Sequence, residues 1–336
     1  MGDLAAPPMG GWTRMGPTHM TKHWGRAVPN AASETLARAA HLYYVLGLTQ
    51  AEVAKRLSIT RFKVHRLLAQ ARETGMVRIE IDVPFAERLE LEAALMERYG
   101  LTAAFVCPSD ETEDMPLPIV IGQYASGIVN DLLRDGQTVA TSWGSTLLAL
   151  ARSIDPGAVQ QLSVVSMIGS LSTRSSQDKY EAASVLADRI GAECFYLPGP
   201  ILCDNVDAKK AIESQPVVQT AMKKAKEADV ALLSIGGSEM SSLRLAGVAS
   251  EADYDSATKA GAIGNFLGRF IGKDGAVIDH PLNALCLGIG PEDIRQIPVR
   301  VLCAGGKHKV AAIGAVLRRE AATILVTDED TAKALT

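Results

Sequence analysis

The chain has 336 residues, of which 47% are hydrophobic and 21% charged, so wholesale disorder is excluded and two globular domains are favoured over one. The net charge of −4 is unevenly divided: residues 1–84 hold 11 Lys and Arg against 6 Asp and Glu, and the remainder holds 23 against 32. A basic N-terminal part suits an anionic partner such as nucleic acid, because phosphate attraction acts locally. Chance unevenness would give the same balance.

The sequence shows no sign of a membrane span, a secretion signal or a metal site. No stretch approaches the roughly 18 consecutive apolar residues of a membrane helix, and the N-terminus lacks an apolar signal segment. The five cysteines form no Cys-x-x-Cys pair and no Cys/His cluster with metal-ligand spacing. We therefore expect a cytoplasmic protein with reduced thiols, no metal and no cofactor.

Residues 1–32 lack hydrophobic periodicity and are predicted to form a disordered tail. From Leu36 onward, apolar residues recur at i, i+3, i+4 and i+7, which predicts an amphipathic helix from about Ser33 to Leu46. Gly47 would close this helix.

Two further helices follow at close spacing. Thr49 and Glu52 form a capping box that starts a helix over Gln50–Leu57, and Thr60 caps another from Arg61 to about Thr74. Small Ala54 lies where two such helices would cross. This spacing predicts a DNA-binding helix-turn-helix over residues 33–84, whose last helix enters the major groove. The alternative is a small helical subdomain whose basic face is exposed to solvent and does not bind DNA.

The outward face of that last helix carries side chains suited to DNA. Arginine reads guanine or grips phosphate, glutamine reads adenine, phenylalanine touches the thymine methyl group, and lysine suits phosphate. The candidate DNA-binding residues are Gln50, Thr60, Arg61, Phe62, Lys63, His65, Arg66 and Gln70.

Residues 76–100 predict a strand and then a helix. Met76–Asp82 alternates apolar and charged residues, as a winged-helix wing would. A linker helix is expected within residues 85–100, over Ala86–Tyr99 and ended by Gly100. Its apolar stripe would serve equally to pair two subunits or to pack on its own domain.

Residues 101–336 alternate β-rich runs with helical segments such as Tyr180–Ile190 and Val310–Arg319, which predicts a mainly parallel, Rossmann-like α/β domain. Ligands of such sheets bind at the carboxyl ends of strands. The candidate strands are Ala103–Cys107, Thr138–Ser142, Leu162–Ile168, Cys194–Leu197, Val230–Ile235, Ala284–Gly288, Val299–Cys303 and Ile324–Thr327.

Three loops at predicted strand ends have binding chemistry. Ser142–Thr146 places hydroxyls and free backbone N–H groups at a helix start, which suits an anion, although a plain N-cap is an equal reading. Ala304–Lys307 combines two glycines with a cation. Gly169 and Ser170 follow another strand, and Gly236-Gly237-Ser238 follow a further one; turn formation is the simpler role of both. Effector-binding candidates from these loops are Ser142, Trp143, Gly144, Ser145, Thr146, Gly169, Ser170 and Lys307.

Motifs for catalysis are absent from the sequence. It contains no G-x-G-x-x-G fingerprint, no Walker P-loop and no G-x-S-x-G elbow. No Ser/His/Asp set or carboxylate pair stands out, so we expect no catalytic residue and no enzyme.

From about residue 34 to 336 the chain resembles the SorC/DeoR-type family of sugar-binding transcriptional regulators. Each matching segment is weak alone, but their order and spacing are specific. The segments are Leu48–Leu57, Val64–Leu68, Ser142–Thr146, Gly264–Phe270 and Ala304–Lys307.

The resemblance implies a body folded like sugar-phosphate isomerases and CoA-transferases, retained for binding without turnover. It implies a phosphorylated sugar or polyol effector, with the phosphate against Gly144, Ser145, Thr146 and Lys307 and the hydroxyls near Asn265. It also implies a homo-oligomer, dimer or tetramer, bound to operator DNA.

Two positions depart from the family pattern. An acidic residue is frequent at the position of Asn265, and Asp at that of Gly272, so effector choice is expected to differ. The Val64-His65-Arg66 sequence and the Cys107-Pro108 pair resemble the corresponding segments of the polyol-responsive members of the family, such as erythritol repressors.

The sequence thus leads to the hypothesis of a repressor of a carbohydrate or polyol operon, gated by an effector. Activation is an open alternative. A sugar-phosphate isomerase-like enzyme with an accessory DNA-binding head is a rival from another class. A constitutive DNA-binding protein with a purely structural body is a third reading.

Overall fold

The computed structural model divides the chain into two compact units, Met1–Asp82 and Val83–Thr336, here called the head and the body. Of the predicted tail, residues 1–32, only residues 31 and 32 are among the described residues. The described ranges are residues 31–79, 85–108, 115–157, 159–170, 181–237 and 247–336.

The head is built from α1 (Ala31–Ala40), the π-helix η1 (His41–Val45), α2 (Gln50–Leu57) and α3 (Arg61–Glu73). The first predicted helix is confirmed as α1 continuing into η1, and it begins two residues earlier than expected. Gly47 then takes a φ of 66°, a left-handed conformation that suits glycine.

The capping box predicted between α1 and α3 is confirmed. The Thr49 side chain accepts from the Glu52 backbone N–H at 3.3 Å, and the Glu52 carboxylate accepts from the Thr49 N–H at 2.8 Å. These bonds lower the pKa of Glu52. Thr60 caps α3 in the same way, accepting from the Lys63 N–H at 3.2 Å. Capping satisfies N–H groups that a helix start leaves unpaired.

The predicted wing strand is wrong within the described residues. Residues 76–79 form no strand, and Met76 and Ile79 are exposed. The Val77 N–H bonds to the Ala71 carbonyl at 2.9 Å, so the chain continues from the end of α3 rather than pairing with another strand. Glu80–Asp82, the rest of this prediction, lies outside the described residues.

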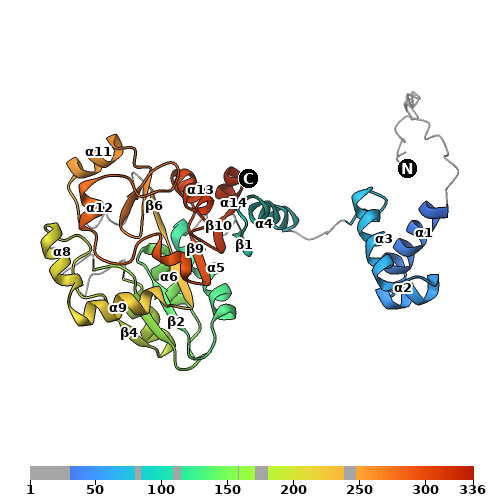
Figure 1. The fold of residues 1–336 in the computed structure, drawn as a ribbon, viewed down its shortest axis with the longest axis horizontal. Helices are drawn as coiled ribbons and strands as arrows, with labels where there is room; N and C mark the ends of the chain where they lie inside the picture. The colour runs from blue at the N-terminus through green and yellow to red at the C-terminus, as the bar shows by residue number, and fades with distance from the viewer. Residues whose placement is uncertain (1–30, 80–84, 109–114, 158, 171–180, 238–246) are drawn as a thin grey trace, which may run out of the picture. The chain divides into compact units, whose positions relative to one another are not determined.

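The body contains a seven-stranded sheet in the order β1-β10-β9-β5-β2-β3-β4, and every neighbouring pair is parallel (Figure 1). The predicted mainly parallel α/β fold is thereby confirmed. The strands are β1 (Ala103–Cys107), β2 (Thr138–Thr141), β3 (Ser163–Ser166), β4 (Glu193–Phe195), β5 (Val230–Leu233), β9 (Val299–Cys303) and β10 (Ile324–Asp328).

Helices lie on both faces of this sheet. None of the described helices is long and apolar enough to cross a membrane. The helices are α4 (Ala86–Tyr99), α5 (Leu117–Leu132), α6 (Ser145–Ser153), α7 (Ala183–Ile190), α8 (Val206–Glu213), α9 (Pro216–Lys226), α11 (Glu251–Lys259), α12 (Pro281–Leu285), η4 (Asp293–Gln296), η5 (Lys307–Lys309), α13 (Val310–Arg318) and α14 (Glu329–Leu335).

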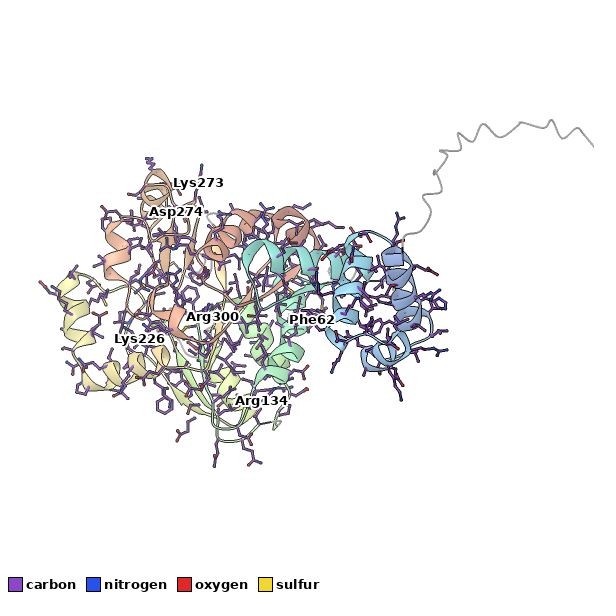
Figure 2. All side chains as sticks on the ribbon, turned by 45° about the vertical axis from the view of Figure 1, so that its right-hand side comes forward. Phe62, Arg134, Lys226, Lys273, Asp274 and Arg300 are labelled. Carbon is purple, nitrogen blue, oxygen red and sulfur yellow. The ribbon has the colours of Figure 1, made fainter. Side chains whose placement is uncertain are left out.

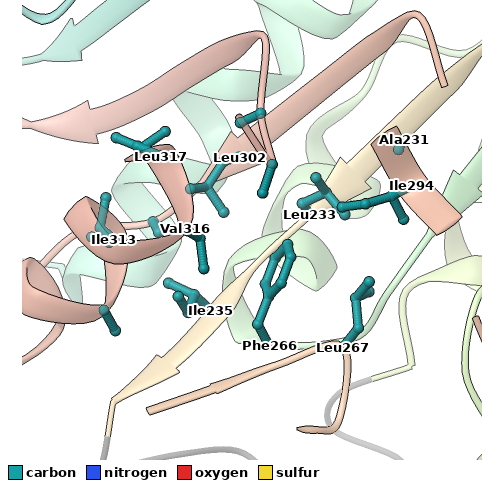
Figure 3. Packing of buried hydrophobic residues seen from close by; sticks show 14 of the residues in the cluster. Ala231, Leu233, Ile235, Phe266, Leu267, Ile294, Leu302, Ile313, Val316 and Leu317 are labelled. Atoms are coloured by element: carbon teal, nitrogen blue, oxygen red, sulfur yellow. The ribbon is translucent and has the colours of Figure 1, made fainter. Parts of the chain in front are cut away.

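Side-chain alternation along the strands builds a separate core on each face. In β5, Val230 and Leu232 join the cluster beneath α5, α6 and α7, whereas Ala231 and Leu233 join the cluster on the opposite face. Strands buried on both faces are typical of parallel sheets covered by helices. Figure 3 shows the second cluster, in which Leu233 lies near Phe266.

A second, three-stranded antiparallel sheet was not predicted. It consists of β6 (Ile235–Gly237), β7 (Gly264–Phe266) and β8 (Arg269–Ile271). The two-residue turn between β7 and β8 has positive φ at both Leu267 (49°) and Gly268 (77°), as tight hairpin turns require. The Arg269 guanidinium holds the turn by donating to the carbonyl of Leu267 at 3.0 Å and to that of Ile289 at 2.9 Å.

The predicted strand over Ala284–Gly288 is wrong. Pro281 starts the short helix α12, which extends to Leu285, because proline is well suited to the first helical position. Only Cys286 and Gly288 make isolated bridges, to Leu202 and Ile168.

The linker helix α4 has the predicted bounds and packs on the body. Leu95 is fully buried in the body's core, while Leu89 and Met96 stay exposed. α4 lies beside β1 and α14 (Figure 1). The predicted stripe of Leu89, Ala93 and Met96 is exposed and does not pack on the body; the face of α4 that does pack there is marked by Leu95, outside that stripe.

None of the five cysteines, all of which the structure describes, forms a disulfide. Cys194 is half-buried and the other four are buried, in line with their expected role as small apolar residues. Burial raises the pKa of Cys303 to about 12, so this thiol remains protonated at neutral pH.

Candidate functional site

A cavity of about 330 Å³ opens where four adjacent strands, β9, β5, β2 and β3, reach their carboxyl ends. Along the chain, β2 to β4 extend the sheet in one direction, and β5, β9 and β10 extend it in the other. The direction reverses between β2 and β5, the point where open α/β sheets bind ligands. The segments after these two strands nearly touch, since a Cβ on Gly144 would lie 3.3 Å from Ser234 Oγ.

The segment after β2 supplies hydrogen-bond donors to the cavity. Ser142, Trp143, Gly144 and Ser145, all predicted from the sequence, line it. The Ser142 hydroxyl and the Trp143 indole nitrogen are buried and have no hydrogen-bond partner among the described residues. Gly144 precedes α6 with a φ of 143°, and no side chain caps this helix start. Unpaired N–H groups at a helix start bind anions.

Thr146 is not brought to the cavity. Its side chain is buried at 2% exposure in the second position of α6. Gly122 of α5 lies so close to the Thr146 carbonyl that a Cβ there would clash. The α5–α6 contact therefore occupies the space around this residue.

The cation of the cavity is Lys309, not Lys307. Lys309 lines the cavity, and burial lowers its pKa below the usual 10.5. Lys307 has a side chain that is 84% exposed and pairs with Asp330 at 3.3 Å. The 3-10 turn η5 separates the two lysines, because residues two apart in such a turn point in different directions.

Asp328 fixes the glycine loop that precedes η5. The Gly306 N–H donates to Asp328 Oδ2 at 3.0 Å and to Thr331 Oγ1 at 2.8 Å. Asp328 also caps α14, accepting from the Thr331 N–H at 2.9 Å. Gly305 packs so tightly against this carboxylate that a Cβ there would clash with Oδ2. The two glycines thus allow Asp328 to set the position of the loop.

Gly169 and Ser170, predicted as effector contacts, do not line the cavity. A Cβ on Gly169 would lie 2.6 Å from the Pro200 carbonyl oxygen, and Ser170 is exposed. The residue that β3 contributes instead is Ile168. Gly272, where the chain departs from the family pattern, also lies outside the lining, in the turn after β8.

Asn265 does line the cavity and is buried, opposite Gly236 in the β6–β7 pair. Its amide offers both donors and an acceptor to a ligand. Sequence reasoning did not identify several lining residues, although a polar residue directly after β5 was a signal for Ser234. The missed residues are Leu117, Pro118, Ile168, Ser234, Ile235, Leu267, Gly268, His308 and Lys309, whereas Gly236 and Gly305 belong to two of the loops predicted at strand ends.

The charge of the cavity favours an anionic, hydroxylated ligand. Among the described lining residues there is one Lys or Arg, Lys309, and no Asp or Glu. Hydroxyl, amide and indole groups share the wall with apolar residues. No group of His, Cys, Asp and Glu among the described residues could hold a metal ion.

In the head, the seven outward residues predicted on and before α3 are all exposed, and Gln50 is partly exposed. Phe62 is 72% exposed, unusual for an aromatic side chain (Figure 2). Arg61, Lys63 and Arg66 form no ion pair within the part of the chain that the structure describes. Among the residues that the structure describes, this face of α3 is therefore positively charged without a paired carboxylate.

Comparison with known proteins agrees with this architecture. Residues 83–336 match the family model described as "Putative sugar-binding domain". The deoxyribonucleoside regulator of Bacillus subtilis (strain 168) is 30% identical over 302 residues, covering 88% of this chain and 95% of that protein. The erythritol catabolism regulatory protein EryD of Brucella abortus (strain 2308) is 29% identical over 308 residues, covering 90% and 97%.

The crystal structure of the full-length sorbitol operon regulator SorC from Klebsiella pneumoniae aligns with a TM-score of 0.68 at 28% identity. The alignment covers 90% of this chain and 98% of that one. The alignment with a full-length regulator therefore extends over both the head and the body. This chain belongs to the SorC/DeoR-type family of sugar-binding transcriptional regulators.

Proposed function

We propose that this protein is a repressor of a carbohydrate or polyol catabolic operon, and that a phosphorylated sugar or polyol bound in the body changes its affinity for operator DNA. The observation that carries the proposal is the cavity itself. It combines a partly buried cation, a helix start without a side-chain cap and buried donors that have no hydrogen-bond partner among the described residues, and it lies in a chain that also has an exposed basic helix.

The phosphate group would lie between the start of α6 and Lys309. Free N–H groups of the helix start and the lysine ammonium both form charge-assisted hydrogen bonds with phosphate oxygens. The hydroxyl groups of the ligand would then meet Asn265, Ser234 and the Ser142 hydroxyl, which supply both donors and acceptors. The apolar side of the cavity would contact the carbon chain.

On the DNA side, α3 would enter the major groove. Arg61 and Arg66 are long enough to reach guanine or phosphate, and exposed Phe62 can contact a thymine methyl group. A homo-oligomer would present two such helices to inverted half-sites. Operator binding, oligomer formation and a cytoplasmic location all belong to this proposal.

We expect the body to bind its effector without converting it. A sugar-phosphate isomerase needs a positioned base; the described lining offers no carboxylate, and its one imidazole is that of the exposed His308. The regulatory names of the relatives point the same way. Their names also suggest the first compounds to try, namely phosphorylated and free forms of deoxyribose, erythritol and sorbitol.

The test is operator binding by the full chain to the promoter region beside its own gene, at fixed salt, with and without these compounds. We expect sequence-specific binding that one phosphorylated compound weakens. Specific binding that no compound changes would contradict the effector role, and absence of specific binding at low salt would contradict the regulator. Product formation from any of the compounds would favour the enzyme instead.

A further inference from the structure

Helix α14 connects the cavity loop to the linker helix α4 through hydrogen bonds at both of its ends. Its first turn holds Gly306, and the residues at its other end, Leu335 and Thr336, meet Arg98 and Tyr99 of α4. α4 is the element of the body that directly follows the head in the chain. Figure 1 shows α14 and α4 side by side.

At the cavity end, the contacts leave the loop little freedom to move alone. One carboxylate, Asp328, and one hydroxyl, Thr331, share the Gly306 N–H, and the Thr331 hydroxyl donates to Asp328 at 2.6 Å. Thr331 is fully buried and Asp328 is 5% exposed. Lys309 follows in the same loop, and its N–H bonds to the Gly306 carbonyl at 2.8 Å. An anion that draws Lys309 into the cavity therefore pulls on Gly306 and on the start of α14.

At the far end, α14 is bonded to the last turn of α4. The Tyr99 hydroxyl donates to the Leu335 carbonyl at 3.1 Å, and the Arg98 guanidinium donates to the Thr336 carbonyl at 2.5 Å. Leu335 is buried at 3% exposure, so its carbonyl belongs to a packed residue, whereas Thr336 is exposed. Tyr99 is partly buried against the same core.

Between its two ends α14 is too short to absorb a displacement. It spans seven residues, about 10 Å at 1.5 Å per residue, and Ala332 in its middle is fully buried. A helix of two turns packed on one side moves as a rigid element, since interior packing is close to crystalline.

We propose that α14 is the element that couples occupancy of the cavity to α4, with Asp328 as the positioning residue at the cavity end and Tyr99 and Arg98 as the receiving residues. This inference rests on the proposed effector site. It assigns a physical route to the regulation: the anion orders the Gly305–Lys309 loop, α14 follows through Asp328 and Thr331, and α4 is ordered through its last turn. Binding that rigidifies one site changes the cost of ordering another.

The test compares the wild-type full chain with three variants of it: Tyr99→Phe combined with Arg98→Ala, Tyr99→Phe alone, and Arg134→Ala as the control. Arg134 likewise donates to backbone carbonyls at a helix end, those of Asp131 and Leu133 at 2.7 Å each, but contacts neither α14 nor α4 (Figure 2). Tyr99→Phe alone serves as a milder variant, since it removes one hydroxyl and preserves the packing of the ring. The probe is inorganic phosphate, with sodium chloride at equal ionic strength as the reference. Amide hydrogen exchange is read for residues 305–309, α14 and α4.

In the wild-type chain and in Arg134→Ala, we expect phosphate to slow exchange in all three segments. In the Tyr99 and Arg98 variants, slowing should persist in residues 305–309 and α14 and be lost in α4. Slowing in α4 that the variants leave intact, or slowing confined to residues 305–309 in the wild-type chain, would overturn the coupling and leave the binding site standing. No slowing in residues 305–309 would refute the anion site itself, and the coupling with it.

Discussion

At the scale of single residues, Lys309 carries the strongest prediction about the cavity. Replacing it by methionine removes the only Lys or Arg charge of the described lining and keeps most of the side-chain volume. A hydrogen bond to a charged group contributes about 1.5–3 kcal/mol, so affinity for a sugar phosphate should fall by about 10- to 150-fold. The matched control is Lys307→Met, two residues away, whose side chain points to Asp330 and solvent. Calorimetric titration of both variants checks this; equal losses would contradict the assignment.

The lowered pKa of Lys309 gives that binding a pH dependence. Burial favours the neutral amine in the free protein, so its pKa lies below 10.5, whereas a bound anion favours the ammonium form. Affinity should therefore be constant while Lys309 is protonated and should fall as the pH rises through its lowered pKa. The measurement belongs above about pH 8, where phosphate monoesters are already dianionic.

Arginine at the same position separates this effect from general loss of structure at high pH. Because a guanidinium keeps its charge throughout this range, Lys309→Arg should bind with an affinity that is flat in pH. For stability the sign is opposite: the cost of burying the charged lysine is present below its lowered pKa and is relieved as the pH rises. A fall in affinity that Lys309→Arg shares would contradict Lys309 as its cause.

The two lysines also show what sequence could and could not predict at this scale. The Ala304–Lys307 segment was correctly expected at a strand end, but the lysine that lines the cavity is Lys309, two residues beyond the predicted Lys307. Which lysine faces the cavity depends on the turn η5, whose orientation is set by Gly306 bonding to Asp328, 22 residues along the chain. No local pattern reports a contact of that separation. Ser142–Ser145 were found because they directly follow their strand.

At the scale of elements, α3 carries a prediction about DNA. Arg66→Ala should weaken operator binding by about 1–3 kcal/mol if it reads a base, and should relax the sequence preference at that base pair. Lys63→Ala should weaken binding uniformly over sequences and reduce the slope of log affinity against log salt by about 1. Arg152→Ala, an exposed arginine on α6 of the body, is the control and should change neither. Fluorescence anisotropy over a salt series, with operator and scrambled DNA, checks all three. An Arg152 effect equal to that of Arg66 would contradict readout by α3.

Elements with strong local signals were predicted well, and those that depend on distant partners were not. The helix α2 has its own capping box, and α4 has its own apolar stripe and terminal glycine. The predicted wing strand is wrong because alternation of apolar and charged residues is not enough to form a strand. A strand also needs a hydrogen-bonded partner strand, and residues 76–79 have none among the described residues. The β7–β8 hairpin was missed because its turn places Leu267 at positive φ, where glycine or asparagine is the usual signal. The packing of the buried Leu267 side chain offsets the cost of its positive φ.

At the scale of the whole molecule, alternation of strands and helices was enough to predict a parallel α/β body, but not its strand order. The order places β1, the first strand of the body, at an edge beside β10, the last one. This pairing brings the two ends of the body together, so that α4 and α14 come into contact. It also creates the reversal between β2 and β5 where the cavity lies. The site is thus a product of topology, to which each loop adds only a part.

The division into head and body predicts two separable unfolding transitions. The head has its own small core, including Val53, Val64 and Leu68, and the body has two larger clusters on either side of its sheet. A ligand that binds one folded unit stabilises that unit alone, by about 2.7 kcal/mol at 100 times its dissociation constant. Phosphate or a sugar phosphate should therefore raise the melting temperature of the body and leave that of the head unchanged.

A variant of the head makes the reciprocal test. Thr49→Ala removes the cap of α2 and should destabilise the head by about 0.5–2 kcal/mol, without moving the transition of the body. Differential scanning calorimetry of the wild-type chain and Thr49→Ala, each with and without phosphate, measures all four combinations. If Thr49→Ala and phosphate moved the same transition, the two units would unfold as one. The effector would then act on the head through shared stability, and coupling through α14 would no longer be needed to explain regulation.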